Sequence, residues 1–251
     1  MNFKLSKNQV DRFSRQIILK NIGSLGQKKI IQSKVLIIGM GGLGCPAAEF
    51  LTRAGVGLIG IIDYDKIDLS NLHRQSLYNN KDLKKFKVDV AKNKLNQINP
   101  NTKIISYKIK ANKNNFEKIL KKYDFIIDGS DNFKTKFLTN DICNKFKKCL
   151  ITGAISKFEG HVFTFAFKNK KDPCLRCFLQ EDKISDDILN CEYDGVLGSV
   201  AGVVGAIQAN EVLKQILNIG KSLSGFILII DLLSLNFRKV KIKMRKPCWC
   251  N

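Results

Sequence analysis

The sequence predicts an α/β fold: a Rossmann-like, doubly wound, mostly parallel sheet with a C-terminal antiparallel extension. Three observations lead to this prediction. Short apolar runs alternate with segments of helical spacing from residue 34 to residue 153. A glycine-rich turn joins the first apolar run to the helix that follows it. After Gly153, apolar residues alternate with polar ones, which is typical of antiparallel strands.

The elements of the first half each have a local reason. The first 33 residues are polar and compatible with helix. Val35-Leu36-Ile37-Ile38 is a continuous apolar run, typical of a strand buried on both faces. Pro46 stands near the start of the next helix, where a proline is tolerated. The expected strands are 34–39, 58–63, 103–109, 125–127 and 149–152, and the expected helices are 45–53, 84–98, 115–122 and 133–146.

The second half begins with an alternating strand and then loses its regular pattern. Residues 172–194 are polar and rich in cysteine, without periodicity, so we expect a long functional loop there. The remaining elements are expected to be strands at 161–167, 226–231 and 235–244 and a small-residue helix at 199–217. Because no repeat or linker is visible, we expect one domain, 1–251, with a helical segment 1–33, a core 34–153 and an extension 154–251.

The chain of 251 residues has a formal net charge of +21. Its lysines are scattered among asparagines and isoleucines and form no basic block, which points to codon bias. We therefore do not expect nucleic acid as a partner, and an acidic protein partner stays open. The most apolar long stretch, 196–213, contains Gln208, Asn210 and Glu211, so no membrane span is expected. No secretory signal is visible at the N-terminus, so the expected location is cytoplasmic.

The glycine turn indicates a nucleotide site. Gly39, Gly41 and Gly44 fit the pattern G-x-G-x-x-G between a strand and a helix. Such a turn lets backbone approach a phosphate closely, and the helix N-terminus favours an anion. Asp63 stands 19 residues after Gly44, where an acid that binds ribose hydroxyls is expected. The turn alone does not distinguish NAD, FAD and ATP.

The residues after Asp63 favour a triphosphate. Asn71 and Arg74 follow closely, and Lys87 lies on the next helix. Arginine offers a planar fork of donors to phosphate, and lysine adds a positive charge. Asp131 is expected at the end of the fourth strand, on the edge of the sheet where ligands bind. A carboxylate beside phosphates is a natural ligand for Mg²⁺.

These motifs together resemble one family. GMGGLG, IIDYDKIDLSNLHRQ, FKVDVAK, DGSDN, CLRC and GVLGSVAGVVGAIQANEVLK are similar to segments of the ThiF/MoeB/HesA family, related to the adenylation half of ubiquitin-activating enzymes. The resemblance covers about residues 13–250. It implies ATP-dependent adenylation of the C-terminal Gly-Gly carboxylate of a ubiquitin-like sulfur-carrier protein, ThiS-like in thiamine or MoaD-like in molybdopterin synthesis. No rhodanese-like segment follows, so a separate sulfurtransferase or cysteine desulfurase is expected.

The resemblance also assigns roles to residues. It implies a homodimer in which Arg15 reaches into the neighbouring site, and it places the carrier and a zinc ion on the extension. The resemblance also implies a set of residues that bind the nucleotide and its Mg²⁺. They are Gly39, Gly41, Gly42, Gly44, Asp63, Ser70, Asn71, Arg74, Lys87, Asp131 and Asn132.

The eight cysteines fall into three groups. Cys174 and Cys177 form a CxxC, and the family places a second pair where this chain has Cys248 and Cys250; four thiolates hold structural Zn²⁺. That second pair is CxC, one residue shorter, so a reactive dithiol or a three-cysteine site stays open. Cys191 matches a position where relatives carry an acyl- or sulfur-transferring cysteine, although a spare loop cysteine is equally expected. Cys45, Cys143 and Cys149 lie in apolar segments and are expected in the core.

Three other functions stay open. The first is an enzyme like tRNA threonylcarbamoyladenosine dehydratase, which the positive charge favours and the terminal cysteines disfavour. The second is an NAD-dependent oxidoreductase, for which Asp63 is suitable but no hydride-acceptor site is visible. The third is a nucleotide-binding scaffold without catalysis.

Overall fold

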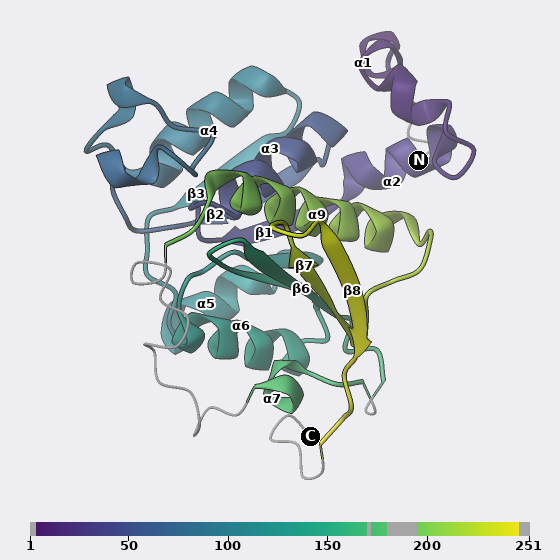
Figure 1. Ribbon diagram of the computed structural model, residues 1–251. Helices are drawn as coiled ribbons and strands as arrows, with labels where there is room; N and C mark the ends of the chain where they lie inside the picture. The colour runs from purple at the N-terminus through teal and green to yellow at the C-terminus, as the bar shows by residue number, and fades with distance from the viewer. Residues whose placement is uncertain (1–3, 170–171, 180–194, 246–251) are drawn as a thin grey trace.

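The computed structural model describes residues 4–169, 172–179 and 195–245. One sheet of eight strands organises this part of the chain (Figure 1). The strands are β1 (Lys34–Ile38), β2 (Leu58–Ile62), β3 (Lys103–Tyr107), β4 (Phe125–Asp128), β5 (Cys149–Ser156), β6 (Glu159–Phe165), β7 (Phe226–Asp231) and β8 (Asn236–Lys241). Their order across the sheet is β3-β2-β1-β4-β5-β6-β7-β8.

The direction of the strands changes at β5. The pairs β3-β2, β2-β1, β1-β4 and β4-β5 are parallel, and the pairs β5-β6, β6-β7 and β7-β8 are antiparallel. The predicted fold class is therefore confirmed: a Rossmann-like, mostly parallel sheet with an antiparallel C-terminal extension. The chain order reverses beside β1, which pairs with β2 on one side and β4 on the other, and ligands bind at such a switch point.

Helices cover both faces of the sheet. They are α1 (Lys7–Ile17), α2 (Gly23–Gln32), α3 (Gly44–Ala54), α4 (Lys87–Ile98), α5 (Lys113–Leu120), α6 (Phe133–Lys145), α7 (Leu175–Phe178) and α9 (Gly198–Leu217), with 3₁₀ turns η1 (Leu69–Asn71) and η2 (Asn80–Asp82). Helices α2, α3, α4 and α9 lie on one face, and α5, α6 and α7 lie on the other (Figure 1). The N-terminal helix α1 stands away from the sheet, against α2.

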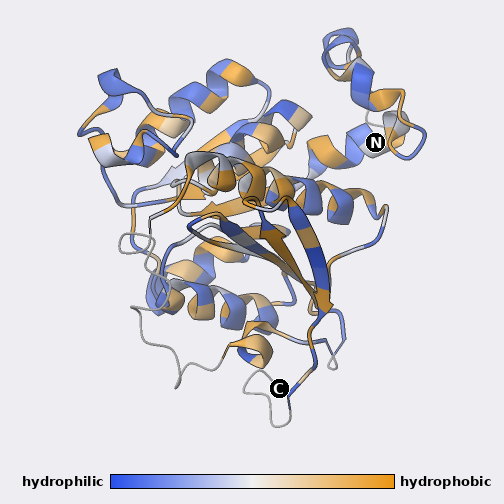
Figure 2. Ribbon diagram, in the orientation of Figure 1, coloured by the Kyte–Doolittle hydropathy of each residue, from blue (hydrophilic) through white to orange (hydrophobic). Residues whose placement is uncertain are grey.

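Each face has its own hydrophobic core. Val35, Ile37 and Ile59 point towards α3 and α9, and Leu36, Ile38 and Ile126 point towards α5 and α6. Apolar colour accordingly fills the central strands and the inner sides of the helices in Figure 2. This burial on both faces is why the parallel strands read as continuous apolar runs in the sequence.

Some predicted boundaries were wrong because single residues take left-handed backbone. Lys84 has φ of 63°, which no helix accommodates, so the helix expected from residue 84 begins at Lys87. Leu235 has φ of 55° and belongs to a turn, so the last strand begins at Asn236. The loop expected at 172–194 contains α7 in its described part.

The sequence predicts that Asp131 ends the fourth strand, and this prediction is wrong. The strand β4 ends at Asp128, and Asp131 lies in the turn before α6. Within the described residues, no helix combines the length and apolar character that crossing a membrane requires.

Candidate functional site

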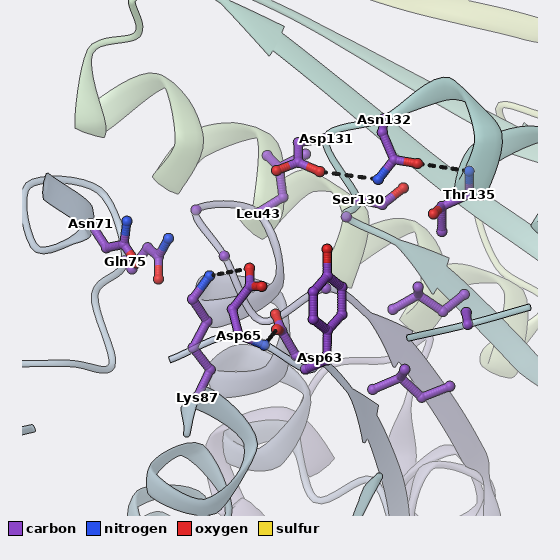
Figure 3. A pocket seen from close by; sticks show the side chains of 18 of the residues that line it. Leu43, Asp63, Asp65, Asn71, Gln75, Lys87, Ser130, Asp131, Asn132 and Thr135 are labelled. Atoms are coloured by element: carbon purple, nitrogen blue, oxygen red, sulfur yellow. Dashed lines mark hydrogen bonds and ion pairs between the residues drawn. The ribbon is translucent and has the colours of Figure 1, made fainter. Parts of the chain in front are cut away.

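A cavity of about 450 Å³ opens at the carboxyl ends of the parallel strands (Figure 3). The turn after β1, the segment after β2 and the turn after β4 supply much of its wall. The start of α4 adds Lys87, and the segment after β3 adds Ile109 and Ala111. The edge of the sheet at which the sequence predicts a ligand site therefore contains a cavity.

The glycine turn has the close backbone approach that its sequence requires. Gly39 has φ of 84°, and a Cβ there would stand 2.9 Å from the carbonyl oxygen of Gly129. Gly41 and Gly42 line the cavity. Gly44, in contrast, begins α3 outside the cavity wall, where a Cβ would stand 1.9 Å from the carbonyl oxygen of Gly39. Gly44 thus lets the helix pack against the turn.

Asp63 lies at the end of β2 and is only 8% exposed. Its Oδ2 accepts a hydrogen bond from the Met40 amide at 2.7 Å, and its Oδ1 accepts one from the Asp65 amide at 2.8 Å. Burial raises the pKa of this carboxyl above its usual value, and the charge of Lys87 opposes the shift. A carboxylate has about four acceptor positions, so lone pairs remain for the hydroxyl groups of a ligand.

Five cationic side chains line the same cavity, and Arg74 and Lys87 are the two that the sequence predicts as phosphate-binding residues. Lys87 is buried, and its Nζ lies 3.0 Å from Oδ2 of the half-exposed Asp65. Arg74 donates from Nη1 to the Ser70 carbonyl oxygen at 2.9 Å, and its Nη1 lies 2.7 Å from Nε2 of His73. Because a guanidinium does not give up its proton, Nε2 of His73 is the acceptor. These contacts hold the Arg74 guanidinium in the wall of the cavity.

The 3₁₀ turn η1 presents Ser70 and Asn71. Its N-cap is Asp68, whose Oδ1 accepts from the Ser70 amide at 3.1 Å, while Oδ1 of Asn71 accepts from the Asp68 amide at 3.3 Å. The pKa of Asp68 is lowered to about 2, chiefly by a hydrogen bond from Lys84. Local capping therefore positions both residues of the motif in the cavity wall.

The turn before α6 brings a carboxylate to the opposite wall. Asp131 is exposed and points into the cavity, and its Oδ1 accepts from Nδ2 of Asn132 at 3.2 Å (Figure 3). Asn132 also caps α6, since its Oδ1 accepts from the Thr135 amide at 2.9 Å. Asp131 forms no ion pair with another described residue, so its carboxylate fits the oxygen ligand that Mg²⁺ prefers.

Sequence reasoning missed the buried ion pair beneath this turn. Asp128 is fully buried, and its Oδ2 lies 2.9 Å from Nζ of Lys136, which lines the cavity and also donates to the Gly153 carbonyl oxygen at 2.7 Å. Thr152 donates to the same Oδ2, and Ser130 donates to Oδ1. The pair therefore connects β4, β5 and α6 below the turn that carries Asp131. A lysine in a polar helix gives no sequence signal of such burial.

A second missed residue is Gln75, the neighbour of Arg74 in the chain. It is 3% exposed and lines the cavity beside Asn71 (Figure 3). One sequence signal points to Gln75: it directly follows Arg74, which the sequence predicts as a phosphate-binding residue.

The structure does not bring Arg15 to the cavity. It lies on α1, is exposed, and is not part of the cavity wall of its own chain. The described residues therefore leave its expected role in a neighbouring subunit as a prediction.

The CxxC pair has a geometry that fits a metal site. Sγ of Cys174 lies 3.9 Å from Sγ of Cys177, close to the separation of about 3.8 Å between two sulfurs bound tetrahedrally to zinc at about 2.3 Å. Both cysteines are buried. Cys191, Cys248 and Cys250 lie outside the described residues. Within the described ranges, no group of three or more side chains of ligand type is gathered.

Arg176, which lies between the two cysteines in the chain, connects the short helix α7 to α6. Arg176 makes a forked pair with Asp141, with Nε to Oδ1 at 2.8 Å and Nη2 to Oδ2 at 2.7 Å. Its guanidinium also stands 4.7 Å from the centre of the Phe137 ring. Such bidentate geometry fixes orientation as well as distance. The short helix α7 therefore sits on the same helix that carries Lys136.

Cys45 and Cys143 belong to the core, as predicted, while Cys149 is partly exposed. Burial raises the pKa of the Cys45 thiol to about 12 and that of the Cys143 thiol well above its usual value. Both buried thiols therefore stay protonated and unreactive at pH 8. We expect peptide mapping after iodoacetamide treatment at pH 8 to show both cysteines unmodified in the folded protein and alkylated in urea. Fast labelling of Cys45 in the folded state would contradict this burial.

Comparison with known proteins gives consistent matches over the chain. The ThiF family model matches residues 13–250. "Adenylyltransferase and sulfurtransferase MOCS3" of Aedes aegypti is 40% identical over 97% of this chain and 55% of its own length. "Sulfur carrier protein adenylyltransferase" of Thermus thermophilus is 37% identical over 97% of this chain and 91% of its own length. The chain thus spans about half the length of the MOCS3 relatives and nearly all of the bacterial one.

Solved structures agree with the fold. The crystal structure of E. coli MccB with MccA-N7isoASN has a TM-score of 0.81 at 22% identity, covering 98% of this chain and 75% of that one. The structure of PaaA has a TM-score of 0.80 at 25% identity, covering 97% of this chain and 77% of that one. The MccB likeness supports the fold of the whole sheet and its helices.

Proposed function

The chain belongs to the ThiF family, and from that premise we propose that it is an ATP-dependent adenylyltransferase for a ubiquitin-like sulfur-carrier protein. One observation carries the proposal: the wall of a single cavity contains the buried acid and the two cations that the sequence predicts, together with a carboxylate that has no ion partner among the described residues. These groups are Asp63, Arg74, Lys87 and Asp131. They match the ribose, the phosphates and the metal ion of a bound nucleoside triphosphate.

The chemistry proposed is attack by the terminal glycine carboxylate of the carrier on the α-phosphorus of ATP. A new oxygen–phosphorus bond forms, the bond from the α-phosphorus to the bridging oxygen breaks, and pyrophosphate leaves. The product is an acyl-adenylate. No protein nucleophile is needed, so the work of the site is positioning and neutralisation of charge.

The residues divide this work by position. Ile109 and Ala111 supply apolar wall beyond Asp63, which suits the base, and Asp63 accepts from the ribose. The glycine turn, Arg74 and Lys87 face the phosphates, with Ser70 and Asn71 beside them. Asp131 would hold Mg²⁺, which supplies further neutralisation of the phosphate charge, and Asn132 would lie beside it in the nucleotide site.

The parts of the chain would have separate roles in this scheme. The core, 34–153, would bind ATP, and the extension, 154–251, would bind the carrier. We expect Cys174 and Cys177 to hold Zn²⁺ together with Cys248 and Cys250. That ion would supply a structural cross-link and no chemistry on the substrate.

Further parts of the scheme rest on family likeness. A homodimer would let Arg15 complete the neighbouring site. Cys191 would act only after adenylation, when a separate sulfurtransferase or desulfurase supplies sulfur. Thiamine and molybdopterin synthesis remain two versions of the same proposal, and they differ in the carrier.

Pyrophosphate exchange tests the function. The protein is incubated with ATP, Mg²⁺, labelled pyrophosphate and one purified Gly-Gly carrier at a time. We expect label to enter ATP with one carrier, and not with the same carrier lacking its last glycine. Substituting Cys191→Ala should leave this exchange unchanged, since adenylation does not use a thiol. Absence of exchange with every ThiS-like and MoaD-like carrier would contradict the proposal.

A further inference from the structure

Asp128 is a buried carboxylate that the proposed mechanism does not use. It is the last residue of β4, and its side chain is fully buried. The Ser130 amide and hydroxyl donate to its Oδ1, and the Thr152 hydroxyl and the Lys136 ammonium donate to its Oδ2. A carboxylate has about four acceptor positions, so these four donors leave none for a ligand. Any role of Asp128 in binding must therefore pass through its neighbours.

The two oxygens of Asp128 contact different parts of the fold. Oδ2 connects the residue to β5 through Thr152 and to α6 through Lys136. Oδ1 accepts instead from a single residue, Ser130, whose amide lies at 3.1 Å and whose hydroxyl donates to the same atom. An aspartate oxygen that accepts from the amide two residues later closes a turn and fixes the backbone there. Oδ1 therefore shapes the segment that leads into Asp131.

The turn between β4 and α6 is held at its ends by other contacts. The Gly129 amide donates to a carbonyl oxygen of β1 at 2.9 Å, and the side chain of Asn132 caps α6. Between these ends, Ser130 donates twice to Asp128. Both Ser130 and Asp131 line the cavity (Figure 3). Asp128 is thus the anchor for the part of the turn that carries the Asp131 carboxylate.

Stability alone does not account for a charge buried at this point. A buried ion pair such as Asp128 with Lys136 often stabilises a fold no more than apolar side chains of the same volume would. A fully satisfied polar network does, however, make the surrounding backbone rigid. A rigid turn has a use here, because the turn presents Asp131 to the cavity.

We propose that Asp128 is a positioning residue for the metal ion: through Ser130 it holds the Asp131 carboxylate in the orientation that binds Mg²⁺. This inference rests on the proposed function, with its Mg²⁺ at Asp131, and adds the residues that orient the metal ligand. Groups that orient a metal ligand through hydrogen bonds typically change metal affinity by about 10–100-fold when they are substituted.

Ser130→Ala tests the connection from Asp128 to the turn. It removes one donor to Oδ1 and leaves the amide bond, the ion pair with Lys136 and the bond from Thr152 in place. Isothermal titration calorimetry without a carrier measures ATP binding in excess Mg²⁺ and again in EDTA. The ratio of the two dissociation constants is the contribution of the metal. We expect this contribution to fall about 10-fold, with binding in EDTA unchanged.

Thr152→Val is the matched control. It removes the corresponding hydroxyl from the other oxygen of Asp128, keeps the shape of the side chain and lies outside the cavity wall. The lost hydrogen bond should lower the melting temperature. The contribution of Mg²⁺ to ATP binding should stay at the wild-type value, because the bonds to Ser130 remain.

Two double variants test the Asp128 oxygen itself. Both contain Lys136→Met, so that no buried ammonium is left alone. In combination with Asp128→Asn, an amide oxygen remains to accept from Ser130, whereas Asp128→Ala removes this acceptor. We expect the metal contribution to be about 10-fold larger in the asparagine variant than in the alanine variant. Circular dichroism at the titration temperature checks that both are folded.

Three results would overturn the inference and leave a nucleotide site in place. The first is an unchanged metal contribution in Ser130→Ala. The second is an equal loss in Thr152→Val, which would assign the whole network a structural role. The third is wild-type protein that binds ATP but gains no affinity from Mg²⁺. If the wild-type protein binds no ATP with or without Mg²⁺, the proposed function fails, and the inference fails with it.

Discussion

Arg74→Ala should lower the rate of adenylate formation by about 10²–10³-fold, the effect typical of removing one donor that stabilises charge in a transition state. The guanidinium lies in the cavity wall, and its contacts in the free protein are the Ser70 carbonyl oxygen and His73. Its removal therefore takes away the charge that would face the phosphates and leaves no buried group unpaired. Pyrophosphate exchange measures the loss, and circular dichroism should show an unchanged melting curve.

Arg53→Ala is the matched control for this variant. Arg53 is 55% exposed, lies on α3 outside the cavity wall, and pairs with Glu49 at 2.7 Å. Its substitution removes the same charge from the surface and should leave exchange unchanged. If Arg74→Ala retains the wild-type rate, Arg74 is not a phosphate-binding residue and the orientation proposed for the triphosphate is wrong.

Lys136→Met should have the largest effect on stability, a loss of about 3–5 kcal/mol in the free energy of unfolding. The substitution removes the ammonium that lies 2.9 Å from Asp128, and Asp128 is fully buried. The remaining carboxylate would keep its bonds to Ser130 and Thr152 but lose its counter-charge. Urea denaturation followed by fluorescence or circular dichroism measures the difference.

Two further variants separate the buried charge from the loss of a lysine. Lys136→Met combined with Asp128→Asn removes both charges and should recover part of the stability, because no buried ion remains alone. Lys145→Met changes a lysine on the same helix that is 62% exposed and pairs with Glu117, so it should change stability by less than about 1 kcal/mol. If Lys136→Met and Lys145→Met lower the free energy of unfolding equally, the buried ion pair does not stabilise the fold more than an exposed one.

Much of the fold could be read from the sequence because its signals are local. A strand buried on both faces must be apolar throughout, so Val35-Leu36-Ile37-Ile38 identified β1 without knowledge of its neighbours. The same holds for the glycine turn and for Asp63, whose spacing is set by one helix and one strand. The predicted boundaries at residues 84 and 235 were wrong because Lys84 and Leu235 have positive φ. The residue types lysine and leucine do not predict this backbone conformation.

The site was predicted only in part, for the same reason. Asp63, Arg74, Lys87 and Asp131 were selected because they follow strands or lie in a recognisable motif, and the structure brings all four to one cavity. Lys136 was missed because a helical lysine usually faces water. Its burial depends on Asp128 and Gly153, which stand on two other strands.

The sequence by itself determined the order of the elements, the class of the sheet and the edge at which a nucleotide would bind, since each follows from the polarity and spacing of neighbouring residues. Only the tertiary structure decided which polar groups are paired and which are left open. Asp128 is neutralised by Lys136, while the Gln75 amide and the Asp131 carboxylate face the cavity without such a partner among the described residues. Pairing is a property of groups brought together from distant parts of the chain, so no local pattern records it.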